Sequence, residues 1–463
     1  MTWTSQQHSS PPHPISTPVP QPPPHTGAGR RTAALAASLL TISGLAAVNA
    51  APGHAASGST LAAGTYVYVA NAGSNSVSVI DTGTKTVVAT VPVGTAPTAV
   101  AASADGHRVY VTDSGSNDVS VIDTGAATGP AVLTTIPVGR QPQSAAVSPD
   151  GSRLYVGNDV IGTISVIDTA SNSVLATVQA GPGAEGLAVS PDGSRIYAAD
   201  TGGSSVTVVK AADNTVAATI PVGATPINLA VAPDGKHVYV PDYNSADLSV
   251  IDTTTNAVTS VPIGGRPHSA AVSPDGSTVY VTDAASGTVS VVATATNTVT
   301  TSFSVGAAPH GIALKIVPGG SSAYVADFGA ASVAAVDLSS DTVAAAIPVG
   351  TNPVDLAVSV IKPVPTALTA GTAFLTLLPL GEANLNATLT ANGAPLAGQT
   401  ITFSDVNGEP LCRATTNAKG KAACNTAPGL LDSVSVLLSG YRATYAGNQN
   451  YLPSSAHGET ALL

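Results

Sequence analysis

A tyrosine followed by a small apolar residue recurs along this chain at intervals of 41 to 45 residues. Few features restrict a fold more, because self-similarity at such a period is typical of proteins built from repeated supersecondary units. The copies cover about 260 residues, so the repeat organises more than half of the 463-residue chain. The seven tyrosines are Tyr68, Tyr110, Tyr155, Tyr197, Tyr239, Tyr280 and Tyr324.

Each copy contains four short segments of β-branched or small residues, separated by turn residues. In the sixth copy we predict an inner strand over 269–273, a Pro-Asp-Gly turn over 274–276, and strands over 278–282, 288–292 and 298–305. Four strands per unit of about 42 residues predict a propeller blade, and seven units predict an all-β, seven-bladed ring. The alanine-rich inner strand fits this fold, because blades crowd together near the axis.

The two ends of the repeat indicate how the ring closes. The first copy begins at its second strand, Tyr66 to Asn71, and the last copy leaves a spare inner strand, 353–359. Pairing these two segments in one blade removes the exposed edges that a linear array would have. We therefore predict that the last strand of the propeller closes the first blade.

The repeat resembles the YVTN-type β-propeller family over residues 64–361. The resemblance rests on the segment Tyr110-Val111-Thr112-Asp113, on the Pro-Asp-Gly turns, and on two further recurring motifs. It implies a propeller, in a group that includes binding proteins, cofactor carriers and a few enzymes. The further motifs are Val-Ile-Asp ending at Asp81, Asp123, Asp168 and Asp252, and Pro-Val-Gly starting at Pro92, Pro137, Pro221 and Pro348.

A different β pattern follows a linker at 362–367. Short predicted strands separated by turns over 368–463 indicate a β-sandwich. The segments 400–403 and 445–451 resemble those of a bacterial Ig-like domain, which implies a spacer or adhesive module. The predicted strands are 385–389, 399–403, 411–415, 421–425, 434–438 and 441–445.

The N-terminal region predicts export. Residues 1–28 have the composition of a disordered extension, and 29–55 combine Arg30 and Arg31 with an apolar run and small residues, as in a signal peptide. The arginine pair fits twin-arginine export, and ordinary Sec secretion fits equally. Residues 56–63 then form a linker. No other segment is long and apolar enough to cross a bilayer, so we expect the mature protein to be secreted without a transmembrane segment.

The two cysteines, Cys412 and Cys424, lie on either side of the turn-like segment 416–420. A short loop centred on Ala418 would place them opposite each other across a hairpin, close enough to bridge. In an oxidising compartment we predict a disulfide, because a metal pair would lack its other ligands.

The charge balance restricts the partners. The chain has 16 Lys and Arg against 27 Asp and Glu, a net charge of −11, and its basic residues form no cluster. Binding to phosphate backbones depends on such clusters, so we predict no nucleic-acid partner. Most aspartates recur at turns and strand ends of the repeat, so the acidic excess follows from the repeat and identifies no partner.

Aligning the seven inner strands places one residue from each blade at an equivalent position beside the central channel. Glu185, His268 and His310 share this ring with Gln143, and Arg140 and Arg266 precede the same strand in two blades. Two imidazoles with a carboxylate can bind a divalent metal, and the arginines can orient an anionic ligand. The alternative is that each Pro-His pair only begins a strand and that its imidazole is exposed to solvent in the channel. The full ring is Thr98, Gln143, Glu185, Ile227, His268, His310 and Val354.

A second ring lies three residues after each repeat tyrosine. Its carboxylates predict either a Ca²⁺ site or, more simply, side chains that satisfy turn backbones. Asp159 stands next to one of its members. The ring consists of Asn71, Asp113, Asn158, Asp200, Asp242, Asp283 and Asp327.

The sequence is consistent with two functions from different classes. The first is a secreted, non-catalytic binding or scaffold protein whose propeller presents a site to an unknown extracellular ligand, cell-surface component or protein. The second is an extracellular enzyme or metal-cofactor carrier, for example a lactonase-like hydrolase, with Glu185, His268 and His310 in its funnel. Phosphate loops, dinucleotide fingerprints and nucleophile elbows are absent from the sequence.

Overall fold

The computed structural model describes residues 61–126, 128–317, 320–375, 383–426 and 439–462. The predicted extension at 1–28, the predicted signal peptide at 29–55, most of the linker at 56–63 and the predicted strand 434–438 lie outside these residues. The chain divides into two units at residue 53, and everything described here belongs to the second. This unit is all-β, and none of its described residues belongs to a helix long and apolar enough to span a membrane.

Seven antiparallel four-stranded sheets follow one another between residues 64 and 361. The strands predicted from the sixth copy agree with β20 to β23 to within two residues, which confirms the repeated four-stranded pattern. The first sheet has the order β28 (Pro353–Ile361), β1 (Gly64–Asn71), β2 (Ser76–Asp81) and β3 (Thr86–Pro92). The second and third contain β4 (Pro97–Ala102), β5 (Arg108–Asp113), β6 (Asp118–Asp123) and β7 (Ala131–Pro137), then β8 (Pro142–Val147), β9 (Arg153–Asn158), β10 (Thr163–Asp168) and β11 (Ser173–Gln179).

The other four sheets repeat this meander along the chain. The fourth and fifth contain β12 (Ala184–Val189), β13 (Arg195–Asp200), β14 (Ser205–Lys210) and β15 (Thr215–Pro221), then β16 (Ala230–Val231), β17 (His237–Asp242), β18 (Asp247–Asp252) and β19 (Val258–Pro262). The sixth and seventh contain β20 (Pro267–Val272), β21 (Thr278–Asp283), β22 (Thr288–Ala293) and β23 (Thr298–Ser304), then β24 (Pro309–Val317), β25 (Gly320–Asp327), β26 (Ser332–Asp337) and β27 (Thr342–Pro348).

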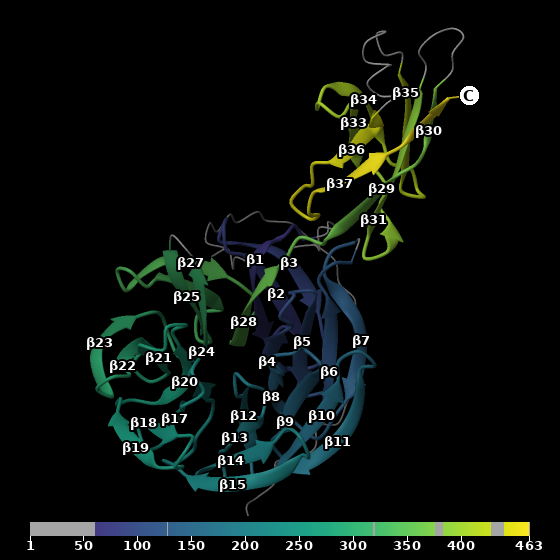
Figure 1. The fold of residues 1–463 in the computed structure, drawn as a ribbon. Coiled ribbons are helices and arrows are strands. Elements are labelled where there is room, and N and C mark those ends of the chain that lie inside the picture. The colour runs from purple at the N-terminus through teal and green to yellow at the C-terminus, as the bar shows by residue number, and fades with distance from the viewer. Residues whose placement is uncertain (1–60, 127, 318–319, 376–382, 427–438, 463) are drawn as a thin grey trace, which may run out of the picture. The chain divides into compact units, whose positions relative to one another are not determined.

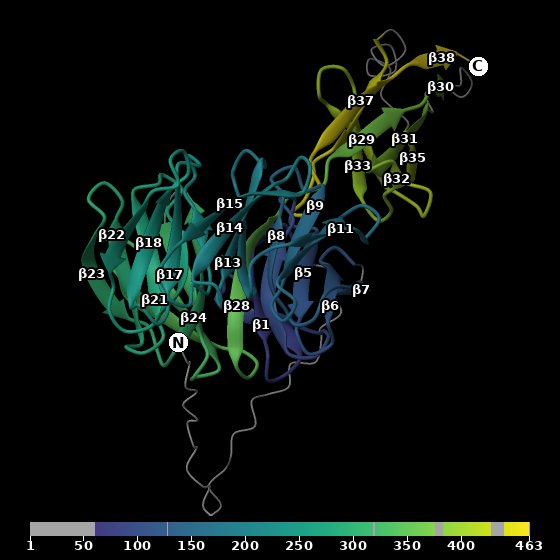
Figure 2. The same cartoon turned by 90° about the horizontal axis from the view of Figure 1, so that it is seen from below.

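The sheets are arranged around a ring (Figure 1). Each inner strand contacts the inner strand of the next sheet, and the series β4, β8, β12, β16, β20, β24 returns through β28 to β4. Strand β28 pairs with β1 from Gly64↔Ile361 to Asn71↔Pro353, and Figure 2 shows these two strands side by side. The first and last segments of the repeat therefore belong to one sheet.

Apolar cores lie between neighbouring sheets. Seven clusters of buried residues each join two adjacent sheets, including one that joins the first and last copies through Val67, Tyr324 and Leu356. The repeat tyrosine contributes to these cores; Tyr68 is fully buried. Because every second residue of a strand faces one neighbouring sheet, the central strands are apolar on both faces.

The C-terminal part contains two sheets around one core. Leu385, Phe403 and Tyr441 are fully buried between them. The first sheet holds β29 (Thr366–Ala370), β31 (Ala383–Ala391), β30 (Ala373–Leu375) and β38 (Thr460–Leu462), with β32 (Ala394–Pro395) and β35 (Lys421–Thr426) paired to β31. The second holds β34 (Pro410–Thr415), β33 (Thr400–Ser404), β36 (Tyr441–Tyr445) and β37 (Ser454–Gly458).

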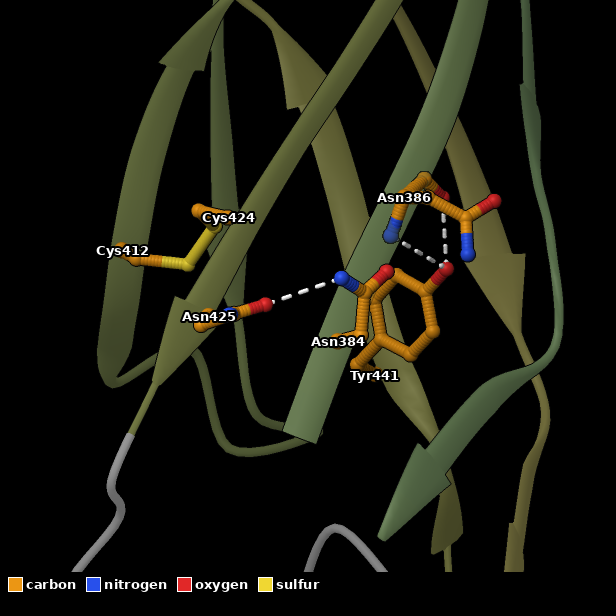
Figure 3. The surroundings of a disulfide bond; sticks show 6 residues. All are labelled: Asn384, Asn386, Cys412, Cys424, Asn425 and Tyr441. Atoms are coloured by element: carbon orange, nitrogen blue, oxygen red, sulfur yellow. Dashed lines mark hydrogen bonds between the residues drawn. A yellow bond between two sulfur atoms is a disulfide. The ribbon is translucent and has the colours of Figure 1, made fainter. Parts of the chain in front are cut away.

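The predicted disulfide is confirmed, but its predicted setting is wrong. Cys412 and Cys424 are bonded, with their Cα atoms 6.5 Å apart. They do not face each other across a hairpin: β34 pairs with β33 in one sheet, whereas β35 pairs with β31 in the other. Figure 3 shows the disulfide together with Tyr441. The Tyr441 hydroxyl donates a hydrogen bond of 2.6 Å to the carbonyl oxygen of Asn386. The disulfide therefore ties the two sheets together.

We expect the double substitution Cys412→Ser, Cys424→Ser to lower the free energy of unfolding of the C-terminal part by about 3 kcal/mol. This is the chain-entropy estimate for a loop of roughly this length. Calorimetry of the full chain tests it, with the transition of the repeat region as internal control. A reducing agent should shift only the wild-type curve; an unchanged C-terminal transition in the variant contradicts this role.

Candidate functional site

A cavity of about 260 Å³ lies where the inner strands converge. All seven residues of the first predicted ring line it, so the structure brings Gln143, Glu185, His268 and His310 to one cavity. Arg140 and Arg266, which were predicted as ligand contacts, are exposed and do not line it. The other lining residues are Ala99, Ser144, Ala145, Leu187, Asn228, Gly311, Phe328 and Asp355.

Aromatic rings form a ladder along one side of the cavity. The imidazoles of His268 and His310 stack with their centroids 4.1 Å apart, and Phe328 stacks on His310 at 4.6 Å. Tyr243 meets His268 edge-on at 6.3 Å, and the guanidinium carbon of Arg266 lies 5.3 Å from the centre of the Tyr243 ring. Three neighbouring sheets supply the four rings. The histidines lie on inner strands β20 and β24, and Tyr243 and Phe328 lie in the loops after β17 and β25.

Burial keeps the two imidazoles neutral. Burial and the neighbouring His310 lower the pKa of His268 to about 3, and burial also lowers the pKa of His310. Each Nδ1 atom is buried and has no hydrogen-bond partner among the described residues. A proton on Nδ1 would be an unpaired buried donor, so we assign the ring proton to Nε2, the nitrogen left accessible.

Glu185 lies on the other side of the ring, in the fourth sheet, whereas the two histidines belong to the sixth and seventh sheets. The Thr201 hydroxyl oxygen lies 2.7 Å from Glu185 Oε2 and 2.7 Å from the carbonyl oxygen of Pro226. The Thr201 hydroxyl is the donor in both contacts, so its single proton is shared between the Glu185 carboxylate and the Pro226 carbonyl. Burial, opposed in part by the Thr201 hydrogen bond, raises the pKa of Glu185.

Asp355 is a cavity residue that the sequence prediction missed. Its Oδ2 accepts a hydrogen bond from the Val100 amide at 3.0 Å, and burial raises its pKa to about 6. Gly311 leaves room for it, because a Cβ there would lie 2.7 Å from Asp355 Oδ1. The signal was present in the repeat: one residue after the first ring, the aligned positions are Ala99, Ser144, Gly186, Asn228, Ser269, Gly311 and Asp355.

The geometry opposes the predicted metal set of Glu185, His268 and His310. Stacked, nearly parallel imidazoles, 16° apart, direct their nitrogen lone pairs along separate planes and not at one ion. Among the residues that the structure describes, no group of three or more His, Cys, Asp or Glu side chains is placed to hold a metal. The histidines and Glu185 line one cavity, with the histidines on one side and Glu185 on the other.

The residues of the second predicted ring do not line the cavity. All seven of its members are buried, and several bond the third strand of their own sheet. Ser120 donates to Asp113 at 2.6 Å and Ser249 donates to Asp242 at 2.6 Å, whereas Asn158 donates to Ser165 at 3.0 Å. These bonds fit the local structural role and not a Ca²⁺ site. Burial raises the pKa of Asp113 to about 6 and that of Asp242 to about 7.

Comparison with known proteins identifies the fold only. No family model and no curated protein matches the chain. Similar solved structures include hydrazine synthase from Kuenenia stuttgartiensis, with a TM-score of 0.54, 21% identity, and coverage of 61% of this chain and 96% of that one. A functionally unknown protein from Desulfotomaculum acetoxidans has a TM-score of 0.57, 18% identity, and coverage of 64% and 98%. A 6-phosphogluconolactonase-like protein from Bacteroides uniformis has a TM-score of 0.53, 17% identity, and coverage of 64% and 99%. At these identities the likeness shows a propeller-like fold and no activity.

Proposed function

We propose that this protein is an exported, non-catalytic binding protein that holds a small ligand in the central cavity of a seven-bladed, YVTN-type β-propeller. The propeller spans 64–361, and 368–463 form an Ig-like spacer or adhesion module. Seven consecutive sheets, the cyclic contacts of their inner strands and the pairing of β28 with β1 support the propeller part. Two sheets around one core support the second.

Export is part of the same proposal. A disulfide persists in oxidising compartments and is rare in the cytosol, so the Cys412–Cys424 bond fits a location outside the cytoplasm. We assign 29–55 as the signal peptide, with Sec or twin-arginine export, and 1–28 as a preceding extension. The expected partner is an extracellular ligand, a cell-surface component or a protein.

The cavity is the observation that carries the binding function. Each of the seven copies contributes its ring residue to the same cavity, and those residues differ from copy to copy although the surrounding repeat is regular. A symmetric structural role would favour the same residue in each copy. Ligand sites are usually concave, with apolar walls and a few convergent polar groups, and this cavity has both.

The histidines favour binding over hydrolysis. A general base works best with a pKa near the operating pH, and burial lowers the pKa of both His268 and His310, so neither histidine suits that role. The stacked imidazoles also lack the metal geometry that a metal-dependent hydrolase requires. We therefore place the lactonase-like alternative second.

A thermal-shift screen of small polar metabolites tests the proposal. We expect at least one compound to raise the melting temperature of the wild-type protein, and Thr98→Trp, which fills the cavity from a partly buried position, to abolish that shift. Thr298→Trp, on the exposed outer strand β23, is the matched control and should respond like the wild type. Equal shifts in the wild type and in Thr98→Trp would exclude the cavity as the site.

A further inference from the structure

The cavity offers hydrogen-bond donors and acceptors in a mixed arrangement. On the aromatic side, the Nε2–H groups of His268 and His310 are donors; Gln143 presents an amide that both donates and accepts. Glu185 Oε1 accepts no hydrogen bond from the described residues and is an acceptor for a ligand, whereas Asp355 already accepts the backbone amides of Val100 and Leu356. A ligand that satisfies this lining must itself carry several groups that both donate and accept, which is the property of hydroxyl groups.

The same lining disfavours charge. Burial is the leading cause of each pKa shift here: it raises the pKa of Glu185 and Asp355 and lowers the pKa of His268 and His310. The shifts of Glu185, His268 and His310 favour the uncharged form, as in a poorly hydrated space. Asp355, with a pKa of about 6, is mostly ionised at pH 7, and the backbone amides of Val100 and Leu356 satisfy its charge. Arg140 and Arg266, which would neutralise an anion, lie outside the lining. A buried charge without a partner is costly, so an uncharged ligand fits best.

Size and shape narrow the class further. A space of about 260 Å³ equals the liquid volume of roughly nine water molecules, which suits a six-membered ring with its substituents. Phe328, Leu187 and Ile227 supply apolar walls between the polar groups. A pyranose has C–H faces for such walls and equatorial hydroxyls for the polar groups.

We infer that the cavity binds a neutral monosaccharide of the pyranose class, with its hydroxyls on Glu185, Gln143 and the His268–His310 pair and its C–H surface on the apolar wall. This inference rests on the proposed function and assigns the ligand class to the same site. It gives Glu185 a defined role: Oε2 accepts the Thr201 hydroxyl, and Oε1 accepts a ligand hydroxyl.

Calorimetric titration of the full exported chain distinguishes the ligand classes. The probes share one ring: D-glucose, D-galactose and D-mannose are neutral, D-glucosamine is cationic and D-glucuronate is anionic. We expect at least one neutral sugar to bind more tightly than both charged sugars. Glu185→Gln, which keeps a side-chain oxygen as acceptor for the ligand hydroxyl, should bind that sugar within about threefold of the wild type. Glu185→Ala and Phe328→Ala should each weaken it at least tenfold, about one hydrogen bond or one apolar contact.

Each other result overturns the inference. Tighter binding of D-glucosamine, with loss of binding in Glu185→Gln, would identify a cation site, and tighter binding of D-glucuronate would identify an anion site. Failure of every sugar would remove the pyranose class, yet the proposed function would stand if the metabolite screen still gave a shift that Thr98→Trp abolishes. Unchanged sugar affinity in both alanine variants would place the sugar outside the cavity.

Discussion

A chain that ends at Asn352 is expected to aggregate, whereas one that ends at Pro365 is expected to be a soluble monomer. Both begin at Ala56 and lack the C-terminal part, so they differ only by β28 and the four residues after it. Without β28, strand β1 has a free edge along its whole length. The core that joins the first and last copies also loses Leu356, which is 4% exposed.

Size-exclusion chromatography with light scattering measures the outcome. We expect nearly all of the shorter chain in aggregates, because an unpaired edge and an opened apolar core act together. Leu356→Asp in the full chain is a second variant that keeps the strand but places a carboxylate in the core, and it should be strongly destabilised. A well-folded monomer from the chain that ends at Asn352 would refute closure by β28.

Asp242→Asn is expected to stabilise the protein at pH 8 by about 1–3 kcal/mol, with little gain at pH 4. Burial raises the pKa of Asp242 to about 7, and the unfolded chain titrates near 3.9. Its contribution to stability is therefore complete below about pH 4 and is lost as the pH rises to 7. Asn71 and Asn158 show that asparagine suits this slot, since each donates to a third-strand serine at 3.0 Å.

Urea unfolding across pH 4 to 8 tests this prediction. The wild type should lose stability through this range, because burial also raises the pKa values of Asp113 and Asp355 to about 6. Asp252→Asn is the matched control: this carboxylate is exposed, bonds the turn amides of Thr254 and Thr255, and should give no gain. A destabilised Asp242→Asn variant at pH 8 would show that the carboxylate is needed in its charged form.

The repeat made the ring of cavity residues predictable. Equivalent positions in identical units must lie at equivalent places around an axis, so aligning inner strands was enough to bring Gln143, Glu185, His268 and His310 together. The aromatic stack could not be predicted from the sequence, because Tyr243 and Phe328 lie in loops whose conformation the repeat does not determine. Stacking also decides the chemistry: the same two histidines would look like metal ligands without the ring orientation.

The missed and mistaken features have separate physical causes. Asp355 lies in the closing strand β28, and the sequence pattern of this strand indicates its pairing but not where its side chains lie. The sequence predicts the two cysteines across a hairpin because the segment between them resembles a tight turn. In the fold, β34 and β35 instead pair with β33 and β31, and only the three-dimensional arrangement of two sheets reveals this exchange.

The most direct measurement locates a bound ligand by the side-chain nitrogen resonances of ¹⁵N-histidine-labelled protein. Variants His268→Gln and His310→Gln assign the two cavity imidazoles. We predict that both rings are neutral at pH 7 with the proton on Nε2, and that a compound found in the thermal-shift screen shifts both sets of resonances while the other histidines stay unchanged. A compound that stabilises the protein and leaves both rings unperturbed would contradict a ligand site in the central cavity.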